Sequence, residues 1–326
     1  MSKEESKMMQ GVAIIIMIFF HVFEPHLNTD YAGTLLGNIA RTQNPVSFYL
    51  VLSGYGMYIV THRSQPDLHK FSRIGKLFLK YWIITSVFVF ISRLLGDSRC
   101  NLSFSEIVLN LTGLSSTYNL VTWFLLPYAM LSLSSPFLFK IMDRRGGTVI
   151  SLFLGFAIYG FSAYMNRYAW FRSNLFQYFY IMLPFLLGGV ICKENVVEKL
   201  RDVMSTSNRW LPCLLLFVLI VVRYFIPSGA FAAIYAATFI LLIVVAHRPM
   251  FLNYALKAFG YHSLNMWMIH FWIRWYMFKE QISQINNSLL EFLTVFVSSY
   301  ILSYCFNLLF KSFSRVFGLA LSSRRN

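Results

Sequence analysis

Ten long apolar segments divide the chain, and they limit its possible folds more than any other feature of the sequence. A helix needs about 17–25 mostly apolar residues to cross the hydrocarbon core of a bilayer. In lipid, backbone polar groups must find partners within the protein, which favours helices. We therefore expect an all-α polytopic membrane protein with about ten transmembrane helices, approximately at residues 8–24, 44–62, 75–95, 121–141, 148–165, 175–192, 210–226, 229–247, 262–279 and 288–311.

The composition points to lipid as the surrounding solvent. Hydrophobic residues make up 57% of the 326-residue chain and Phe occurs 33 times, whereas charged residues make up 13%, against about 25% in a soluble domain. The net charge is +15, but the basic residues form short clusters between apolar segments, as membrane topology requires. We therefore expect no nucleic-acid partner. No metal site is expected either, because the cysteines lack metal or redox spacing: Cys100, Cys192, Cys213 and Cys305.

The distribution of Lys and Arg predicts that both termini are cytoplasmic. With the N-terminus inside, the basic residues fall on the cytoplasmic side, apart from Arg41, Arg93, Arg99, Arg167, Arg172, Arg223, Arg274 and Lys279. The first segment lacks a small-residue cleavage site, so we expect it to be retained as a helix. Residues 226–229 should form a tight turn, and residues 102–112 a short interfacial helix capped by Asn101 or Ser103. We expect residues 1–326 to form one membrane domain.

The first apolar segment contains polar residues at helical spacing. Gln10 and His21 are eleven residues apart, so on a helix they share a face to within about 20° and lie roughly 16 Å apart. Glu24 follows His21 at i+3, where it could accept a hydrogen bond from the imidazole. Such a carboxylate would fix the tautomer of a general base. A structural histidine that hydrogen-bonds to another helix is the alternative interpretation.

Two further patterns carry both a structural and a functional interpretation. Ser53, Gly54 and Gly56 form a small-residue patch in the second segment, which is typical of close helix packing. Arg73, Lys76 and Lys80 lie within about 60° of one helix face at the predicted cytoplasmic end of the third segment. They could be ordinary positive-inside anchors or could bind an anionic group such as a phosphate.

A second intramembrane histidine, His270, lies midway along the ninth segment, one turn from Arg274. An ionisable residue at such a position faces the bundle interior by default. It could hydrogen-bond to a neighbouring helix or take part in a site. Glycine-rich phosphate loops, nucleophile elbows and metal-spaced His/Cys clusters are not found in the sequence.

In this order, the features resemble the acyltransferase-3 family of integral membrane acyltransferases. The first span of that family carries a basic residue, then Gly, an apolar run and a histidine, which is similar to the stretch from Gln10 through Gly11 to His21. The second span carries a Phe-rich stretch that ends in Leu-Ser-Gly-Tyr/Phe, similar to Phe48 to Tyr55. The resemblance extends over nearly the whole chain, and the ordered set of motifs is more specific than any one of them.

Later spans add to the resemblance. Arg73 and Lys76 match a basic pair that opens the third span, Trp123 lies in a matching Trp-Phe-Leu stretch, and the stretch ending at His270 fits the ninth span. The chain departs from the family at two positions. Gln10 replaces a residue that is commonly basic, and Lys76 replaces a second arginine, which keeps the charge but loses bidentate geometry.

The resemblance implies transfer of an acyl group, most often acetyl, from acyl-CoA (acetyl-CoA) to a hydroxyl of a cell-surface or lipid-linked carbohydrate. It implies that His21 is catalytic, either as a base or as an acyl carrier, with Glu24 orienting its ring. The donor phosphates would lie by Arg73 and Lys76, and the long arm of the donor would lie along the face from Gln10 to His21.

The resemblance also implies that Ser53, Tyr55, Trp123 and His270 contact the substrates. It places the protein as a multi-pass protein of the inner (plasma) membrane, in contact with membrane lipid. Two alternatives stay open. One is a polysaccharide polymerase or lipid-linked-sugar transporter, since such proteins are also polytopic, basic and aromatic-rich. The other is an inactive family member, which Gln10 suggests.

Overall fold

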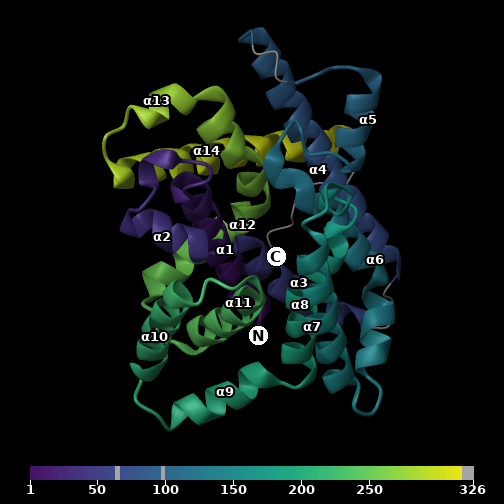
Figure 1. Cartoon of the computed structure of the whole chain (residues 1–326), viewed down its shortest axis with the longest axis vertical. Helices are drawn as coiled ribbons and strands as arrows, with labels where there is room; N and C mark the ends of the chain where they lie inside the picture. The colour runs from purple at the N-terminus through teal and green to yellow at the C-terminus, as the bar shows by residue number, and fades with distance from the viewer. Residues whose placement is uncertain (63–66, 97–99, 318–326) are drawn as a thin grey trace.

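The computed structural model describes residues 1–62, 67–96 and 100–317, and regular secondary structure in these residues is entirely helical (Figure 1). The all-α prediction is therefore confirmed. The longer helices are α1 (Lys3–Phe23), α3 (Pro45–Thr61), α4 (Asp67–Leu94), α6 (Leu125–Met142), α7 (Gly147–Met165), α8 (Gln177–Lys193), α10 (Leu211–Phe225), α11 (Gly229–Val245), α12 (Met250–Phe271) and α14 (Ser288–Phe317). The shorter ones are η1 (Thr29–Tyr31), α2 (Leu35–Thr42), α5 (Phe104–Thr112), η2 (Leu120–Phe124), η3 (Ala169–Arg172), α9 (Val196–Ser205), π-helix η4 (Trp272–Met277) and α13 (Lys279–Ser283).

Each of the ten apolar segments coincides with one of the longer helices, although α12 begins twelve residues before its predicted start. Among the described residues, five helices are long and apolar enough to cross a bilayer: Lys3–Phe23, Phe71–Leu94, Leu120–Met142, Gly147–Met165 and Ser288–Ser312. A sixth span results if α8 and α9, which are bent by 63°, count as one. These helices are consistent with a membrane protein. The ten crossings and the cytoplasmic placement of both termini stay predictions.

Two smaller predictions are confirmed. α10 ends at Phe225 and α11 begins at Gly229, so the chain turns where Pro227 interrupts helix formation. α5 begins after Ser103, whose hydroxyl accepts a hydrogen bond from the Glu106 N–H at 3.4 Å and caps the helix. Of the basic residues used to predict the topology, four lie outside the described residues: Arg63, Arg99, Arg324 and Arg325.

Glycines bring the central helices into backbone contact. α1 packs on α12 and α3 packs on α8. A β-carbon at Gly11 would collide with Leu256 O on α12, and one at Gly54 would collide with Phe185 O on α8. Gly56, by contrast, has no atom within 4 Å of its β-carbon position. Gly54 therefore explains the small-residue patch as a packing feature.

Two polar clusters fix the ends of α1. At its start, the Ser2 hydroxyl and the Glu5 carboxylate form a capping box. Beyond its end, the buried Arg274 forms an ion pair with Glu291 at 2.6 Å, and Glu291 also accepts a hydrogen bond from the Tyr31 hydroxyl at 2.6 Å. These contacts hold the segment after α1 against η4 and α14, and so limit how the far end of α1 can move.

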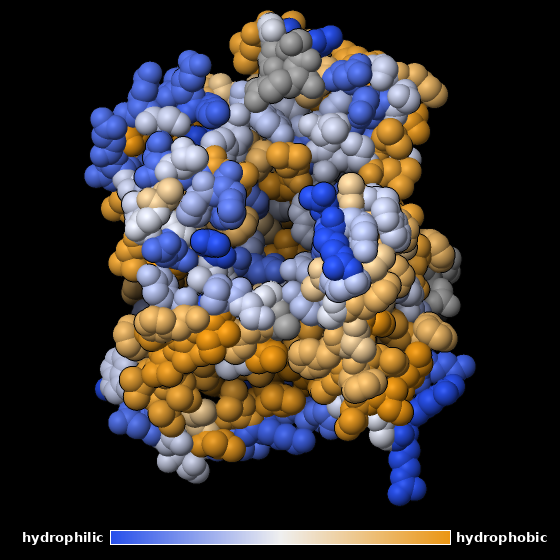
Figure 2. All heavy atoms as spheres, viewed as in Figure 1, coloured by the Kyte–Doolittle hydropathy of each residue, from blue (hydrophilic) through white to orange (hydrophobic). Residues whose placement is uncertain are grey.

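Large apolar side chains are exposed on several outward-facing helices. Examples are Val149 and Phe153 on α7, and Leu214 and Phe217 on α10. Figure 2 shows hydrophobic residues over the lower part of the face in view, with hydrophilic residues around a hollow near its middle. Exposed apolar helix faces of this kind fit contact with lipid acyl chains.

Candidate active site

Two cavities extend into the helix bundle, and we name them by their lining residues. The histidine cavity has a volume of about 490 Å³ and is lined by Met17, Phe20, His21, Glu24, His26, Arg41, Gln43, Asn44, Pro45, Val46, Ser47, Leu50, Val121, Trp123, Tyr159, Tyr180, Ile181, Pro184, Gly229, Ala233 and Trp267. The basic cavity has a volume of about 660 Å³ and is lined by Lys7, Gln10, Met17, Tyr49, Ser53, Arg73, Ile74, Lys76, Leu77, Lys80, Phe124, Leu125, Tyr128, Ser132, Gly260, Tyr261, Ser263, Leu264 and Trp267. Both volumes are typical of small-molecule sites.

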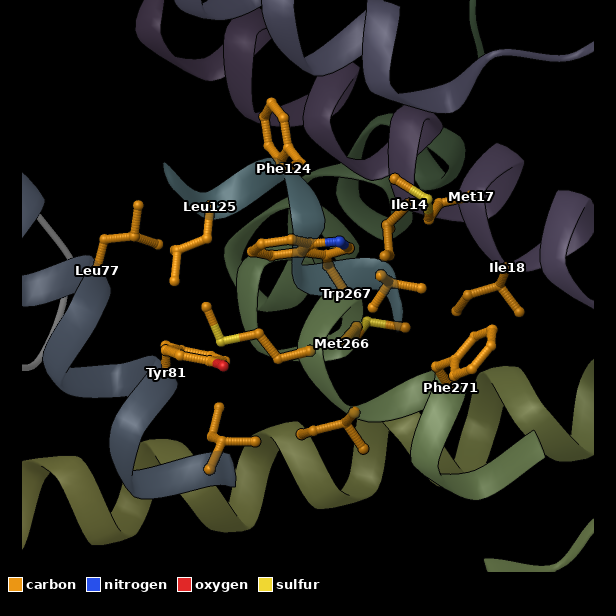
Figure 3. Packing of buried hydrophobic residues seen from close by; sticks show 14 of the residues in the cluster. Ile14, Met17, Ile18, Leu77, Tyr81, Phe124, Leu125, Met266, Trp267 and Phe271 are labelled. Atoms are coloured by element: carbon orange, nitrogen blue, oxygen red, sulfur yellow. The ribbon is translucent and has the colours of Figure 1, made fainter. Parts of the chain in front are cut away.

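The two cavities meet at Met17 on α1 and Trp267 on α12, which line both of them. Both side chains are buried. Figure 3 shows the indole of Trp267 in the middle of the buried cluster, with Phe124 on one side and Met266 on the other. Met17 lies one helical turn before His21, so the junction between the cavities is one turn from the imidazole.

The hydrogen bonds of His21 leave one of its ring nitrogens free. His21 Nδ1 lies 2.9 Å from Met17 O and 3.0 Å from His270 Nε2. His270 Nδ1 lies 3.0 Å from Met266 O. Carbonyl oxygens only accept, so in the neutral pair each Nδ1 carries a proton and His270 Nε2 accepts from His21. His21 Nε2 then holds a lone pair, and no described residue hydrogen-bonds to it.

Glu24 does not orient the His21 ring, contrary to the expected hydrogen bond. α1 ends at Phe23, and Glu24 leaves the helix with extended backbone angles (φ −67°, ψ 123°). The i+3 geometry of a helix therefore does not apply to it. Its carboxylate instead accepts from the N–H groups of His26 at 2.8 Å and Leu27 at 3.2 Å. Glu24 still lines the histidine cavity with His21.

The side chain that hydrogen-bonds to the His21 ring is His270 and not Glu24. Its side chain is fully buried behind His21 and lines neither cavity. It can therefore act on a ligand only through His21, and not by the direct substrate contact that we expected. η4 follows α12 directly and brings the Trp275 indole N–H to 3.1 Å from His21 O. This bond satisfies a carbonyl at the end of α1 that has no partner within the helix.

The basic cavity contains the predicted donor residues and two further lysines. Gln10, Arg73 and Lys76 all line it, together with Lys7 and Lys80. None of the described residues that line it is acidic. Four cationic side chains without a carboxylate among them form a site suited to an anion.

Lys7 is the cavity residue that sequence reasoning missed. Its ammonium group donates to Gln10 Oε1 at 2.9 Å and lies 5.4 Å from the centre of the Tyr261 ring. The signal was present in the spacing, since Lys7 precedes Gln10 by three residues and so shares its helix face. Lys7 thus places a positive charge directly beside the uncharged Gln10.

The expected substrate-contact residues divide among three places. Trp123 lines the histidine cavity and Ser53 lines the basic cavity. Tyr55 lines neither, and its hydroxyl instead accepts from the N-terminal amine of Met1 at 2.7 Å. Tyr55 lies two residues after Ser53, which is half a turn of α3 and turns its side chain away from the cavity.

Comparison with known proteins identifies one family. The model of the acyltransferase-3 family, described as an acyltransferase domain, matches residues 5–308 and therefore nearly the whole chain. The match includes every residue that lines the two cavities. No curated protein and no solved structure matches the chain.

Proposed function

Because the chain belongs to the acyltransferase-3 family of membrane acyltransferases, we propose that it transfers an acyl group, most often acetyl, from cytoplasmic acyl-CoA to a carbohydrate hydroxyl. The donor occupies the basic cavity and the acceptor occupies the histidine cavity. The observation that carries this proposal is the meeting of the two cavities at Met17 and Trp267, one turn from His21. A thioester that reaches this junction from one side lies close to a hydroxyl that enters from the other.

The charge of the basic cavity supports a donor that carries phosphates. Lys7, Arg73, Lys76 and Lys80 can neutralise phosphate groups at the cavity mouth, where Arg73 can form bidentate contacts. The same face of α1 continues for about 21 Å from Lys7 to His21. A donor with phosphates at one end and a thioester at the end of a long arm matches this layout, as acetyl-CoA does.

His21 has the hydrogen bonds that a general base needs. Its Nε2 removes the proton from the acceptor hydroxyl, and the oxygen attacks the thioester carbonyl carbon. The tetrahedral intermediate collapses with cleavage of the carbon–sulfur bond, and the His21 Nε2–H returns the proton to the departing thiolate. His270 Nε2 accepts the Nδ1–H bond throughout, which stabilises the transient imidazolium. A route through an acyl-His21 intermediate uses the same nitrogen as nucleophile.

The lining of the histidine cavity supports a carbohydrate acceptor. Trp123, Tyr159 and Tyr180 offer amphipathic aromatic surfaces. Gln43 and Arg41 add polar groups that can bind hydroxyls. A cell-surface or lipid-linked glycan fits a cavity of this kind in a membrane protein of the inner (plasma) membrane.

The Lys7–Gln10 contact argues against the alternative of an inactive family member. Gln10 carries no positive charge, but Lys7, one turn earlier on α1, supplies one in the same cavity. Membership of an acyltransferase family favours acyl transfer over a polymerase or a lipid-linked-sugar transporter.

Transfer by membrane vesicles tests the proposal. With labelled acetyl-CoA, vesicles with the wild-type protein should move label into membrane glycan or lipid-linked sugar, and His21→Ala should reduce this transfer by about 10²–10⁴-fold. His247→Ala is the matched control, because His247 is exposed and lines neither cavity. Full activity of His21→Ala would refute the assigned role.

A further inference from the structure

The Tyr49 hydroxyl is buried and has no hydrogen-bond partner among the described residues. Tyr49 lies on α3 and lines the basic cavity. A buried hydroxyl without a partner is costly, and it calls for an explanation such as a missing ligand. Because Tyr49 lines the basic cavity, a molecule bound there is a candidate partner for its hydroxyl.

Other hydroxyls line the basic cavity beside Tyr49. Ser53 lies one turn after Tyr49 on the same face of α3, and Ser263 contributes to the wall from α12. Ser263 donates its own hydroxyl to Gly260 O at 2.9 Å, and its oxygen lies near the Tyr49 hydroxyl without forming a hydrogen bond to it. On α12, Ser263 lies between Gly260, which contacts the backbone of Lys7, and Trp267 at the apolar junction. This part of the wall is therefore more polar than the junction, yet it carries no charge.

An uncharged, hydrogen-bonding passage fits the amide groups of a long arm. We propose that the Tyr49 hydroxyl donates a hydrogen bond to an amide carbonyl in the phosphopantetheine arm of the donor. This inference rests on the proposed function, because it requires a coenzyme A thioester in the basic cavity. It assigns Tyr49 a task separate from the cations, which bind the phosphates, and from His21, which acts at the thioester.

Binding of two probes to the purified full-length protein tests the inference. Coenzyme A carries both the phosphates and the arm, whereas adenosine 3′,5′-bisphosphate carries phosphates without the arm. Tyr49→Phe removes only the hydroxyl. It should raise the Kd of coenzyme A by about 5- to 10-fold, as expected for the loss of one hydrogen bond, and leave the Kd of the bisphosphate unchanged.

Tyr178→Phe is the matched control. The Tyr178 hydroxyl lies 2.9 Å from Ser134 Oγ, and Tyr178 lines neither cavity. This variant should bind both probes like the wild type. Thermal unfolding without ligand separates a ligand role from a structural one, because the Tyr49 hydroxyl forms no hydrogen bond with any described residue that Tyr49→Phe could remove. Tyr49→Phe should keep or raise Tm, whereas Tyr178→Phe should lower it slightly.

The outcomes separate this inference from the proposed function. If Tyr49→Phe binds coenzyme A with the same Kd as the wild type, the inference is overturned and the proposed function still stands. Equal weakening of both probes, or a lower Tm without ligand, also overturns it, because the hydroxyl then supports the fold and not the arm. Failure of the wild-type protein to bind coenzyme A overturns both.

Discussion

His21 differs from a histidine that is buried only for packing, because Nδ1 is hydrogen-bonded whereas Nε2 has no hydrogen-bond partner among the described residues. Met17 O and His270 fix Nδ1 as the donor. The unoccupied Nε2 belongs to a residue that lines a cavity. A structural histidine would be expected to satisfy both nitrogens, since burying an unpaired polar group costs free energy.

Substitution of His270 tests whether the pair works as a unit. His270→Leu removes the acceptor for the His21 Nδ1 proton, so the tautomer and the imidazolium are no longer stabilised. We expect kcat to fall roughly 10- to 100-fold, part of a general-base contribution of about 10²–10⁴-fold. The KM for acetyl-CoA should not change, because His270 lines neither cavity.

His270→Gln is the control for this experiment, because its side-chain oxygen can still accept a hydrogen bond. It should recover part of the lost kcat. An unchanged kcat in the Leu variant would contradict the assigned role.

A charge swap tests whether Lys7 supplies the cation beside Gln10. Lys7→Gln should raise the KM for acetyl-CoA by about tenfold, the effect of losing one charge-assisted hydrogen bond to a phosphate. Moving the charge by one turn, in the double variant Lys7→Gln/Gln10→Lys, should restore most of the affinity. Lys3→Gln is the control, because Lys3 is exposed and lines neither cavity. If the KM of the double variant is no lower than that of Lys7→Gln, a cation at position 10 does not replace Lys7.

The sequence predicted individual residues well where helix periodicity governs them. Gln10 and His21 both lie on α1 and each lines a cavity together with Met17, and Arg73 and Lys76 share a cavity with Gln10. Periodicity fails where the helix ends. Glu24 was expected to bond to His21, but it follows the last residue of α1, and local backbone N–H groups bind its carboxylate.

At the scale of elements, α3 and α8 depend on a glycine contact that leaves no room for a methyl group. Gly54→Ala should separate the two helices and lower the stability by about 1–3 kcal/mol or more, the cost of overpacking a tight core. Gly56→Ala, two residues away, should be neutral or raise stability by up to about 1 kcal/mol, because its β-carbon position is open. Thermal unfolding of the purified variants measures both. Equal effects of the two substitutions would contradict the packing.

The ten apolar segments were sufficient to locate the longer helices, because length and hydropathy are properties of the sequence alone. They did not predict that α12 begins at Met250 or continues into the π-helix η4. That continuation depends on contacts distant in sequence, such as the ion pair of Arg274 with Glu291 and the bond of Trp275 to His21 O.

At the scale of the whole molecule, the site is made by bringing the two ends of the chain together. His21 and His270 are 249 residues apart in sequence, and they meet because α1 packs along α12. Neither sequence neighbourhood indicates the other histidine as its partner. The meeting of the two cavities at Met17 and Trp267 likewise depends on the packing of α1, α12 and η2, and no local pattern predicts it.

The most direct test of the account is the sidedness of transfer in proteoliposomes that contain the protein in one orientation. Labelled acetyl-CoA is supplied on the side that exposes Lys7 and Arg73, and the carbohydrate acceptor on the opposite side. The account predicts that label appears in the acceptor across the membrane and that free coenzyme A is released on the donor side. His21→Ala should reduce both the transfer and the release by about 10²–10⁴-fold. Transfer only when donor and acceptor share one side would contradict the proposed entry of donor and acceptor from opposite sides of the junction.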